Sequence, residues 1–182
     1  VAVMASQGAG GPKDEATAAL YYKKSLQTWK KEADDGDSKA ALWAALVYER
    51  KLVPDSSPEK SVPYLLQAAE SGNLTAQGLL AFKYRDGLGV PQDAAKAVEW
   101  FEKAASRKDL GAVMELGIMF RDGKYLPPDR EKAFHWFEKG AEWKDPYSMA
   151  ALADMLLEGT PSAEQAARAL ALYREAAAAG YF

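Results

Sequence analysis

The 182-residue chain contains no cysteine and a single histidine, His135. Without cysteine it can form no disulfide, thiol nucleophile or thiolate metal site, and the redox compartment is left open. One histidine with no second histidine or cysteine to join it is a poor basis for a metal centre or an acid–base pair. We therefore expect His135 to lie on a helix surface or to be half-buried.

Long apolar runs and an excess of basic charge are missing as well. No segment approaches the roughly 20 apolar residues that cross a bilayer. The chain has 23 Lys and Arg against 26 Asp and Glu, interleaved along its length, for a net charge of −3. This balance offers no electrostatic footprint for nucleic acid or an anionic membrane surface. The stretch Gly87-Leu88-Gly89 lacks the Gly-Lys-Ser/Thr sequel of a phosphate loop. We predict no catalytic residue, metal ligand or cofactor.

What the chain does contain is a repeat of 36 residues that holds without insertion from about residue 36 to 179. A large side chain recurs at Tyr48, Tyr84, Phe120 and Leu156, and a second one at Tyr64, Trp100, Trp136 and Leu172. A period of this size is typical of helical units that bury their apolar faces only by stacking on neighbours.

Each block is predicted to form two helices. The residues expected to cap the first helix are Asp37, Asn73, Asp109 and Asp145; Gly87 and Gly123 end two of these helices, and Asp93 and Asp129 cap second helices. Gly36 and Gly72 close second helices, but Lys108 and Lys144 replace that glycine, which predicts a different turn geometry there. Small residues predict close helix packing at positions 68 and 69, 104 and 105, and 176 and 177.

The predicted organisation has a flexible tail at 1–13, a capping helix at 14–35 that resembles the second helix of a preceding unit, and repeats at 36–71, 72–107, 108–143 and 144–179. Residues 180–182 form the end, where Tyr181 and Phe182 fold back as a cap or an apolar edge meets a partner. The pattern Val3-x-Ala5 fits a signal-peptidase site, so a leader remnant is the alternative to a tail.

Two stretches resemble the Sel1-like repeat: Ala112-x-x-x-Leu116-Gly117-x-x-Phe120-x-x-Gly123, and Asp129-x-x-Lys132-Ala133-x-x-Trp136-Phe137-x-Lys139-x-Ala141. The preceding block adds the loop from Tyr84 to Asp93, whereas the first block has Lys51-Leu52-Val53-Pro54-Asp55 in place of the loop glycines. The resemblance implies an all-α, right-handed α-solenoid of about four helix-turn-helix repeats, related to tetratricopeptide arrays, in which the first helices line a concave face. It also implies an adaptor, a regulator or another partner-binding protein, of bacterial origin and often exported, and no catalytic site.

If the first helices line a groove, the residues beside the core columns face a partner. Those predicted to bind another protein are Leu42, Trp43, Leu46, Glu49, Arg50, Phe82, Arg85, Met114, Ile118, Arg121, Asp154 and Leu157. They would form a partly apolar trough with paired charges at its rim. The competing interpretation places several of them in the core between helices. Trp43 is the aromatic residue that we expect to act as an anchor if it faces solvent.

The leading functional hypothesis is a non-enzymatic protein-binding module of the periplasm or cell envelope, with the cytoplasm as the alternative. An immunity protein that blocks a cognate secreted toxin is a sharper form of the same hypothesis. A hydrolase acting on cell-wall or carbohydrate material is a rival, for which the sequence offers no nucleophile–base pair. End-to-end self-association is a further possibility, with a monomer as the other state.

Overall fold

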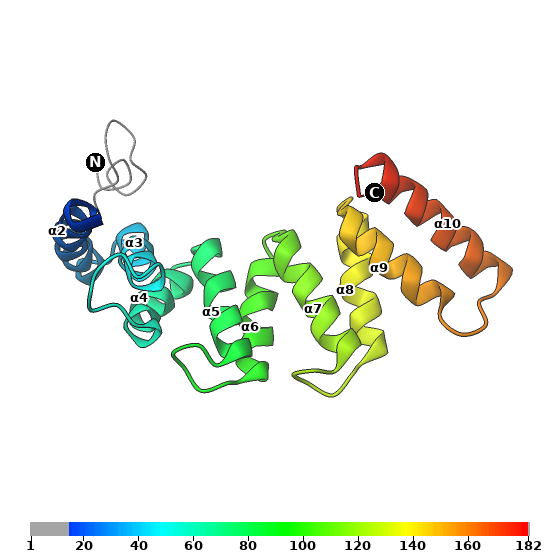
Figure 1. Ribbon diagram of the computed structural model, residues 1–182. Coiled ribbons are helices and arrows are strands. Elements are labelled where there is room, and N and C mark those ends of the chain that lie inside the picture. The colour runs from blue at the N-terminus through cyan, green and yellow to red at the C-terminus, as the bar shows by residue number, and fades with distance from the viewer. Residues whose placement is uncertain (1–14, 182) are drawn as a thin grey trace. The chain divides into compact units, whose positions relative to one another are not determined.

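The computed structural model describes residues 15–181, and within that range the chain contains helices and no strand (Figure 1). The helices are α2 (Glu15–Asp34), α3 (Ser38–Glu49), α4 (Pro58–Glu70), α5 (Leu74–Asp86), α6 (Ala94–Ala105), α7 (Leu110–Asp122), α8 (Arg130–Glu142), α9 (Pro146–Leu157) and α10 (Ala163–Ala178). They belong to two compact units, Val1–Ala97 and Val98–Phe182, and the division falls within α6. In the first unit α2 packs on α3, α3 on α4 and α4 on α5; in the second, α7 packs on α8, α8 on α9 and α9 on α10.

The helices begin at the polar residues predicted to cap them. Asp109 Oδ1 accepts a hydrogen bond from the N–H of Ala112 at 2.8 Å, which satisfies a donor that the first turn would otherwise leave unpaired. The side chains of Asp37, Asn73 and Asp145 cap α3, α5 and α9 in the same way. Asp93 and Asp129 cap α6 and α8, and the hydrogen bond from the backbone N–H three residues further on lowers the pKa of both carboxyl groups.

The turn after each second helix keeps one geometry although its central residue changes. Gly36 and Gly72 take positive φ values of 97° and 83°, as glycine readily does. Lys108 and Lys144 both take a φ of 63°, so the predicted difference in geometry was wrong. In all four turns the N–H of this residue donates to the carbonyl three residues earlier, and the next N–H donates to the carbonyl five residues before it. These bonds hold each lysine in a left-handed conformation that costs an L-residue about 1–2 kcal/mol.

The repeated apolar columns form the core of each unit. Leu80, Leu116 and Leu152 occupy the same position of α5, α7 and α9, and none of them is exposed. Gly117 of α7 lies directly beneath the ring of Phe137 of α8, where an added Cβ would overlap the ring. The two helices of this pair therefore pack with a ring against the backbone, which only glycine allows at this position.

The predicted column of small residues is buried at positions 68, 69, 104, 105 and 176 but not at 177. Ala177 is exposed because α10 packs on α9 and no further helix follows it within the described residues. Tyr181 does fold back, since its ring meets that of Tyr147 edge-on with centroids 4.9 Å apart. Phe182 lies outside the described residues. Leu170 of α10 remains 50% exposed, so an apolar patch persists on this last helix.

Candidate functional site

The twelve residues predicted to bind a partner are all partly or fully accessible. Seven lie in the first unit, on α3, its end and α5, and five lie in the second unit, on α7 and α9. None is buried in the core, which was the competing interpretation. Accessibility is necessary for binding but is shared by ordinary surface residues, so the local geometry of each unit decides which of them form a site.

The first unit contains an open pocket of about 270 Å³ between α2 and α3, here called the aromatic pocket. It is lined by Tyr22, Trp29, Trp43, Leu46, Val47, Arg50 and Leu52. Trp43 is 51% exposed and stacks on Trp29, with ring centroids 6.0 Å apart and an angle of 27° between the planes. Three of the predicted partner-binding residues therefore share one cavity.

Trp29 explains why this cavity is open. At spacings of 36 residues along the chain, its position is occupied by Leu65, Phe101, Phe137 and Tyr173; the first three side chains are fully buried and Tyr173 is half-buried. Trp29 itself is only half-buried, and Trp43 covers one face of its ring. A position that is packed core in α4, α6 and α8 is thus the wall of an accessible pocket in α2.

The charges at the end of α3 are reversed relative to the next repeats. The pair Arg85-Asp86 ends α5, with Arg85 Nη2 and Asp86 Oδ2 2.8 Å apart, and Arg121-Asp122 ends α7, with Arg121 Nε and Asp122 Oδ1 2.6 Å apart. Each of these two helices therefore ends in a pair of opposite charges. The end of α3 carries Glu49-Arg50 instead, and no carboxylate among residues 15–181 forms an ion pair with Arg50.

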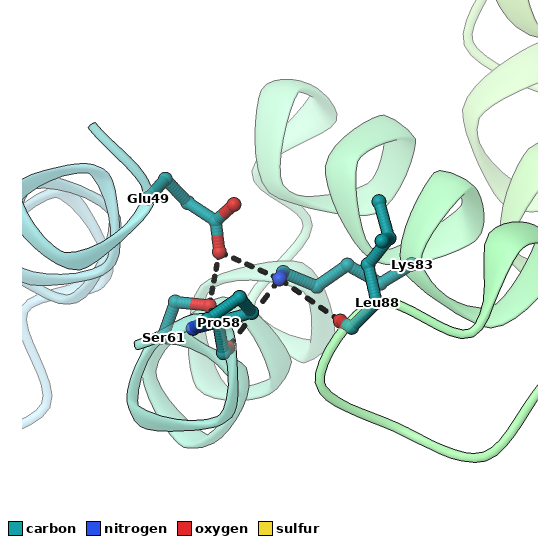
Figure 2. A network of polar contacts seen from close by, with 5 residues as sticks. All are labelled: Glu49, Pro58, Ser61, Lys83 and Leu88. Atoms are coloured by element: carbon teal, nitrogen blue, oxygen red, sulfur yellow. Dashed lines mark hydrogen bonds and ion pairs between the residues drawn. The ribbon is translucent and has the colours of Figure 1, made fainter. Parts of the chain in front are cut away.

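Glu49 belongs to a polar network beneath the surface of the first unit (Figure 2). Its Oε1 lies 2.6 Å from Nζ of Lys83, a side chain only 4% exposed, and also accepts a hydrogen bond from the hydroxyl of Ser61. The Lys83 ammonium donates further to the carbonyl oxygens of Leu88, at 3.1 Å, and Pro58, at 3.4 Å. All three N–H groups of Lys83 are therefore engaged, and the network joins α3, α4 and the loop after α5.

Sequence reasoning placed Glu49 toward a partner and missed Lys83 altogether. Lys83 stands in a column of buried apolar residues that otherwise contains Val47, Met119 and Met155. Ser61 stands in a column that contains Ala97, Ala133 and Ala169 in the later repeats and Ser25 in α2. A polar residue in each of two apolar columns was the signal in the sequence. Serine, lysine and glutamate together suggest a nucleophile and its base, but Ser61 has no exposed surface, so no substrate can reach its hydroxyl.

A second pocket of the first unit, of about 290 Å³, lies between α2, α3 and the loop that follows α3. It is lined by Lys23, Leu26, Gln27, Lys30, Tyr48, Val53, Pro54 and Asp55, and we call it the cationic pocket. The Nζ of Lys30 lies 5.7 Å from the ring centroids of both Tyr48 and Tyr64, and hydrogen bonding to Tyr48 is the main cause that raises the pKa of Lys30. Asp55 forms an ion pair with Lys60, so the two lysines dominate the charge of this pocket.

In the second unit the predicted residues interact with one another. Met114 and Ile118 are half-buried on α7. The hydrogen bond to Asp122, assisted by the charge of Asp154, raises the pKa of Arg121. The carboxylate of Asp154 accepts a hydrogen bond from the hydroxyl of Tyr173, which raises the pKa of Tyr173 to about 12. A pocket of about 520 Å³ at the start of α8 includes none of these residues among those that line it.

His135 is exposed and meets the ring of Trp136 edge-on, as expected of a histidine on a helix surface. Within residues 15–181, no three His, Asp or Glu side chains gather closely enough to hold a metal ion. Nor does any helix of that range combine the length and the apolar character needed to span a membrane.

Paired helices stacked at a 36-residue period define a helical-repeat solenoid. The chain belongs to the Sel1 repeat family, whose model matches residues 1–27, 39–73, 75–109, 111–142 and 146–181. The five matches compare with about four predicted repeats, and the additional one covers residues 1–27. Sel1 repeat proteins are generally protein-interaction modules.

The solved structures that resemble this chain include the following two. The first is c5321, described as a protective antigen present in uropathogenic Escherichia coli strains and displaying an SLR fold; it is 30% identical, with a TM-score of 0.73 over 85% of this chain and 33% of that one. The second is a Sel1 repeat protein from Oxalobacter formigenes, 24% identical, with a TM-score of 0.76 over 98% of this chain and 71% of that one. The chain thus spans about a third of the length of c5321. Comparison with curated protein sequences gave no match.

Proposed function

We propose that this chain is a non-catalytic protein-binding module that anchors an apolar side chain of another protein in the aromatic pocket. The observation that carries the proposal is the exposed Trp43 stacked on Trp29, at a cavity whose equivalent wall position is packed core in α4, α6 and α8. Tryptophan, tyrosine and arginine are the residue types that most often dominate the energy of protein interfaces, and all three line this pocket.

The surroundings of the pocket suit a peptide segment or a helix. Leu42 is half-buried on α3, four residues before Leu46 of the pocket wall, so the two lie on one face of the helix. An apolar side chain in the pocket could thus continue onto an apolar strip of α3. The Ser61–Lys83–Glu49 network supports a scaffold role, because it is closed to substrate and ties three elements of the unit together.

An immunity protein would be one form of this function, with a single tightly bound partner. We place the protein in the periplasm or envelope, as part of this proposal. A cell-wall or carbohydrate hydrolase is disfavoured because the Ser61–Lys83–Glu49 cluster, which brings a nucleophile near a base, has its serine fully buried.

The test is selection of a phage-displayed random peptide library on the intact chain. Peptides recovered on the wild type should bind the Trp43→Ala variant at least about 10-fold more weakly, because truncation of a dominant interface anchor costs about 2 kcal/mol or more. Tyr147→Ala is the matched control, since Tyr147 is 58% exposed but lies outside the pocket. Recovery of no peptides, or equal binding to the wild type and Trp43→Ala, would contradict the proposal.

A further inference from the structure

We infer that the segment bound in the aromatic pocket carries an aspartate or glutamate beside its apolar anchor, and that this carboxylate pairs with Arg50. The inference rests on the proposed function and adds the chemistry of the partner. It starts from the position of Arg50, which lines the pocket and is exposed.

The equivalent helices of the next two repeats show how an arginine at the end of a first helix is neutralised. In α5 and α7 the arginine is followed directly by an aspartate, and the two side chains form an ion pair. In α3 the order is acid then base, so the next residue after Arg50 is Lys51 rather than a carboxylate. The built-in acidic partner of the later repeats is therefore absent from this position.

The preceding residue does not supply the missing charge. Glu49 directs its carboxylate to the buried Lys83 and to Ser61, so it is held on the interior side of α3 (Figure 2). The distance from Glu49 Oε1 to Lys83 Nζ is 2.6 Å, and the three donors of Lys83 fix that geometry. The same network that stabilises the unit thus leaves Arg50 without an ion-pair partner among the described residues.

Neighbouring residues add positive charge to the same part of the unit. Lys51 takes a left-handed φ of 52° at the position where later repeats have glycine, and no carboxylate among residues 15–181 pairs with it. The cationic pocket adds Lys23 and Lys30, and its one acid, Asp55, is neutralised by Lys60. The cationic pocket shares no lining residue with the aromatic pocket, so the positive charge beside the apolar cavity is that of Arg50 and Lys51 at the end of α3, and an acidic segment is its electrostatic complement.

The arginine side chain also favours a carboxylate as the acidic group of the bound segment. Its planar guanidinium donates two parallel hydrogen bonds to a carboxylate, which gives a geometry as well as an attraction. Because Arg50 lies at the accessible edge of the pocket, the contact is screened by salt, and binding should weaken as ionic strength rises. A carboxylate one or two residues from the anchor would reach Arg50 while the apolar side chain fills the pocket.

The experiment compares peptide selections on the wild type, on Arg50→Glu and on Lys39→Glu. Lys39 is an exposed residue at the other end of α3, so Lys39→Glu makes the same change of charge outside the pocket. We expect peptides selected on the wild type and on Lys39→Glu to carry Asp or Glu within two residues of an aromatic or large aliphatic residue. Selection on Arg50→Glu should replace that acid with Lys or Arg. Replacing the acid of a wild-type peptide by its amide should weaken binding by up to about 5-fold in low salt.

The outcomes separate this inference from the proposed function. The inference would be overturned if the selected peptides depend on Trp43 for binding but carry no preferred Asp or Glu. It would also be overturned if selection on Arg50→Glu gives the same acidic preference as selection on the wild type. Either result would leave the proposed function standing. Peptides that bind independently of Trp43 would overturn both. A rise in mass with concentration that is lost in Trp43→Ala, measured by analytical ultracentrifugation, would assign the pocket to a second copy of the chain and also overturn the inference.

Discussion

Replacement of Lys83 by methionine tests how the first unit is held together. Lys83 has 3% of its surface exposed, and methionine already occupies the same buried position in α7 and α9. The side chain therefore fits the site, and the substitution removes a charge with little change in shape. What it leaves behind is Glu49, whose carboxylate loses its ion-pair partner and retains the Ser61 hydroxyl.

The magnitude follows from the exposure of Glu49. Removing one partner of a fully buried ion pair costs about 3–5 kcal/mol. The Glu49 side chain is 26% exposed, so water can solvate part of the stranded carboxylate. We therefore expect Lys83→Met to lower the free energy of unfolding by about 2–3 kcal/mol, below the range for a fully buried pair.

The companion variant restores an apolar interior. Glu49→Leu and Ser61→Ala introduce the residues that the last repeat carries at these two positions. Since a buried pair is often replaced by apolar residues without loss, the triple variant with Lys83→Met should unfold within about 1 kcal/mol of the wild type. Urea unfolding followed by circular dichroism measures each variant. A single Lys83→Met variant as stable as the wild type, or a triple variant less stable than the single one, would refute the reasoning.

Three further outcomes are expected. Lys108→Gly should raise the free energy of unfolding by up to about 1 kcal/mol in a urea titration, because glycine adopts a φ of 63° without the cost that lysine bears; a loss of stability would contradict this. The lowered pKa values of Asp93 and Asp129 add stability that is present above their ordinary value of 3.8 and is lost as the pH falls below it. Asp93→Asn with Asp129→Asn keeps the caps, so its melting temperature should fall less between pH 5 and about pH 3 than that of the wild type; parallel curves would exclude these caps as the cause. Ultraviolet titration should give Tyr173 a pKa of about 12, and Asp154→Asn should move it toward 10.0; an unchanged value would show that Asp154 is not responsible.

The features that the sequence predicted well are periodic or local. A cap such as Asp109 acts on N–H groups three residues away, and a left-handed glycine such as Gly87 acts within its own turn, so both can be recognised from spacing alone. The core columns repeat at 36 residues, and Leu116 and its equivalents are buried as that period predicts. Such features depend on a single helix or on a pattern repeated many times.

The features that escaped prediction depend on contacts between helices. Lys108 takes the glycine geometry because the hydrogen bonds of the turn are the same in every repeat and outweigh the preference of one residue. Lys83 is tolerated in an apolar column because Glu49, from the preceding first helix, meets it there. Spacing along the chain placed Glu49 on the accessible face of α3 but could not show which neighbour its carboxylate would meet. The aromatic pocket escaped for the same reason, since Trp29 belongs to α2 and Trp43 to α3.

The first two complete repeats depart from the others at a few columns, and those departures are spatially related. Lys83 and Ser61 replace apolar residues in the core, and Glu49 turns inward to satisfy them. Arg50 is thereby left without an ion-pair partner among residues 15–181, at the edge of a cavity where Trp29 is only half-buried. Columns shared by all repeats explain how the units fold, because each stacked pair needs the same caps and the same core. At a column where one repeat differs, its residue no longer suits the packing that the other repeats share. Such departures are expected at functional sites. That the polar network and the aromatic pocket meet at the end of α3 is therefore the structural reason to look for the partner there.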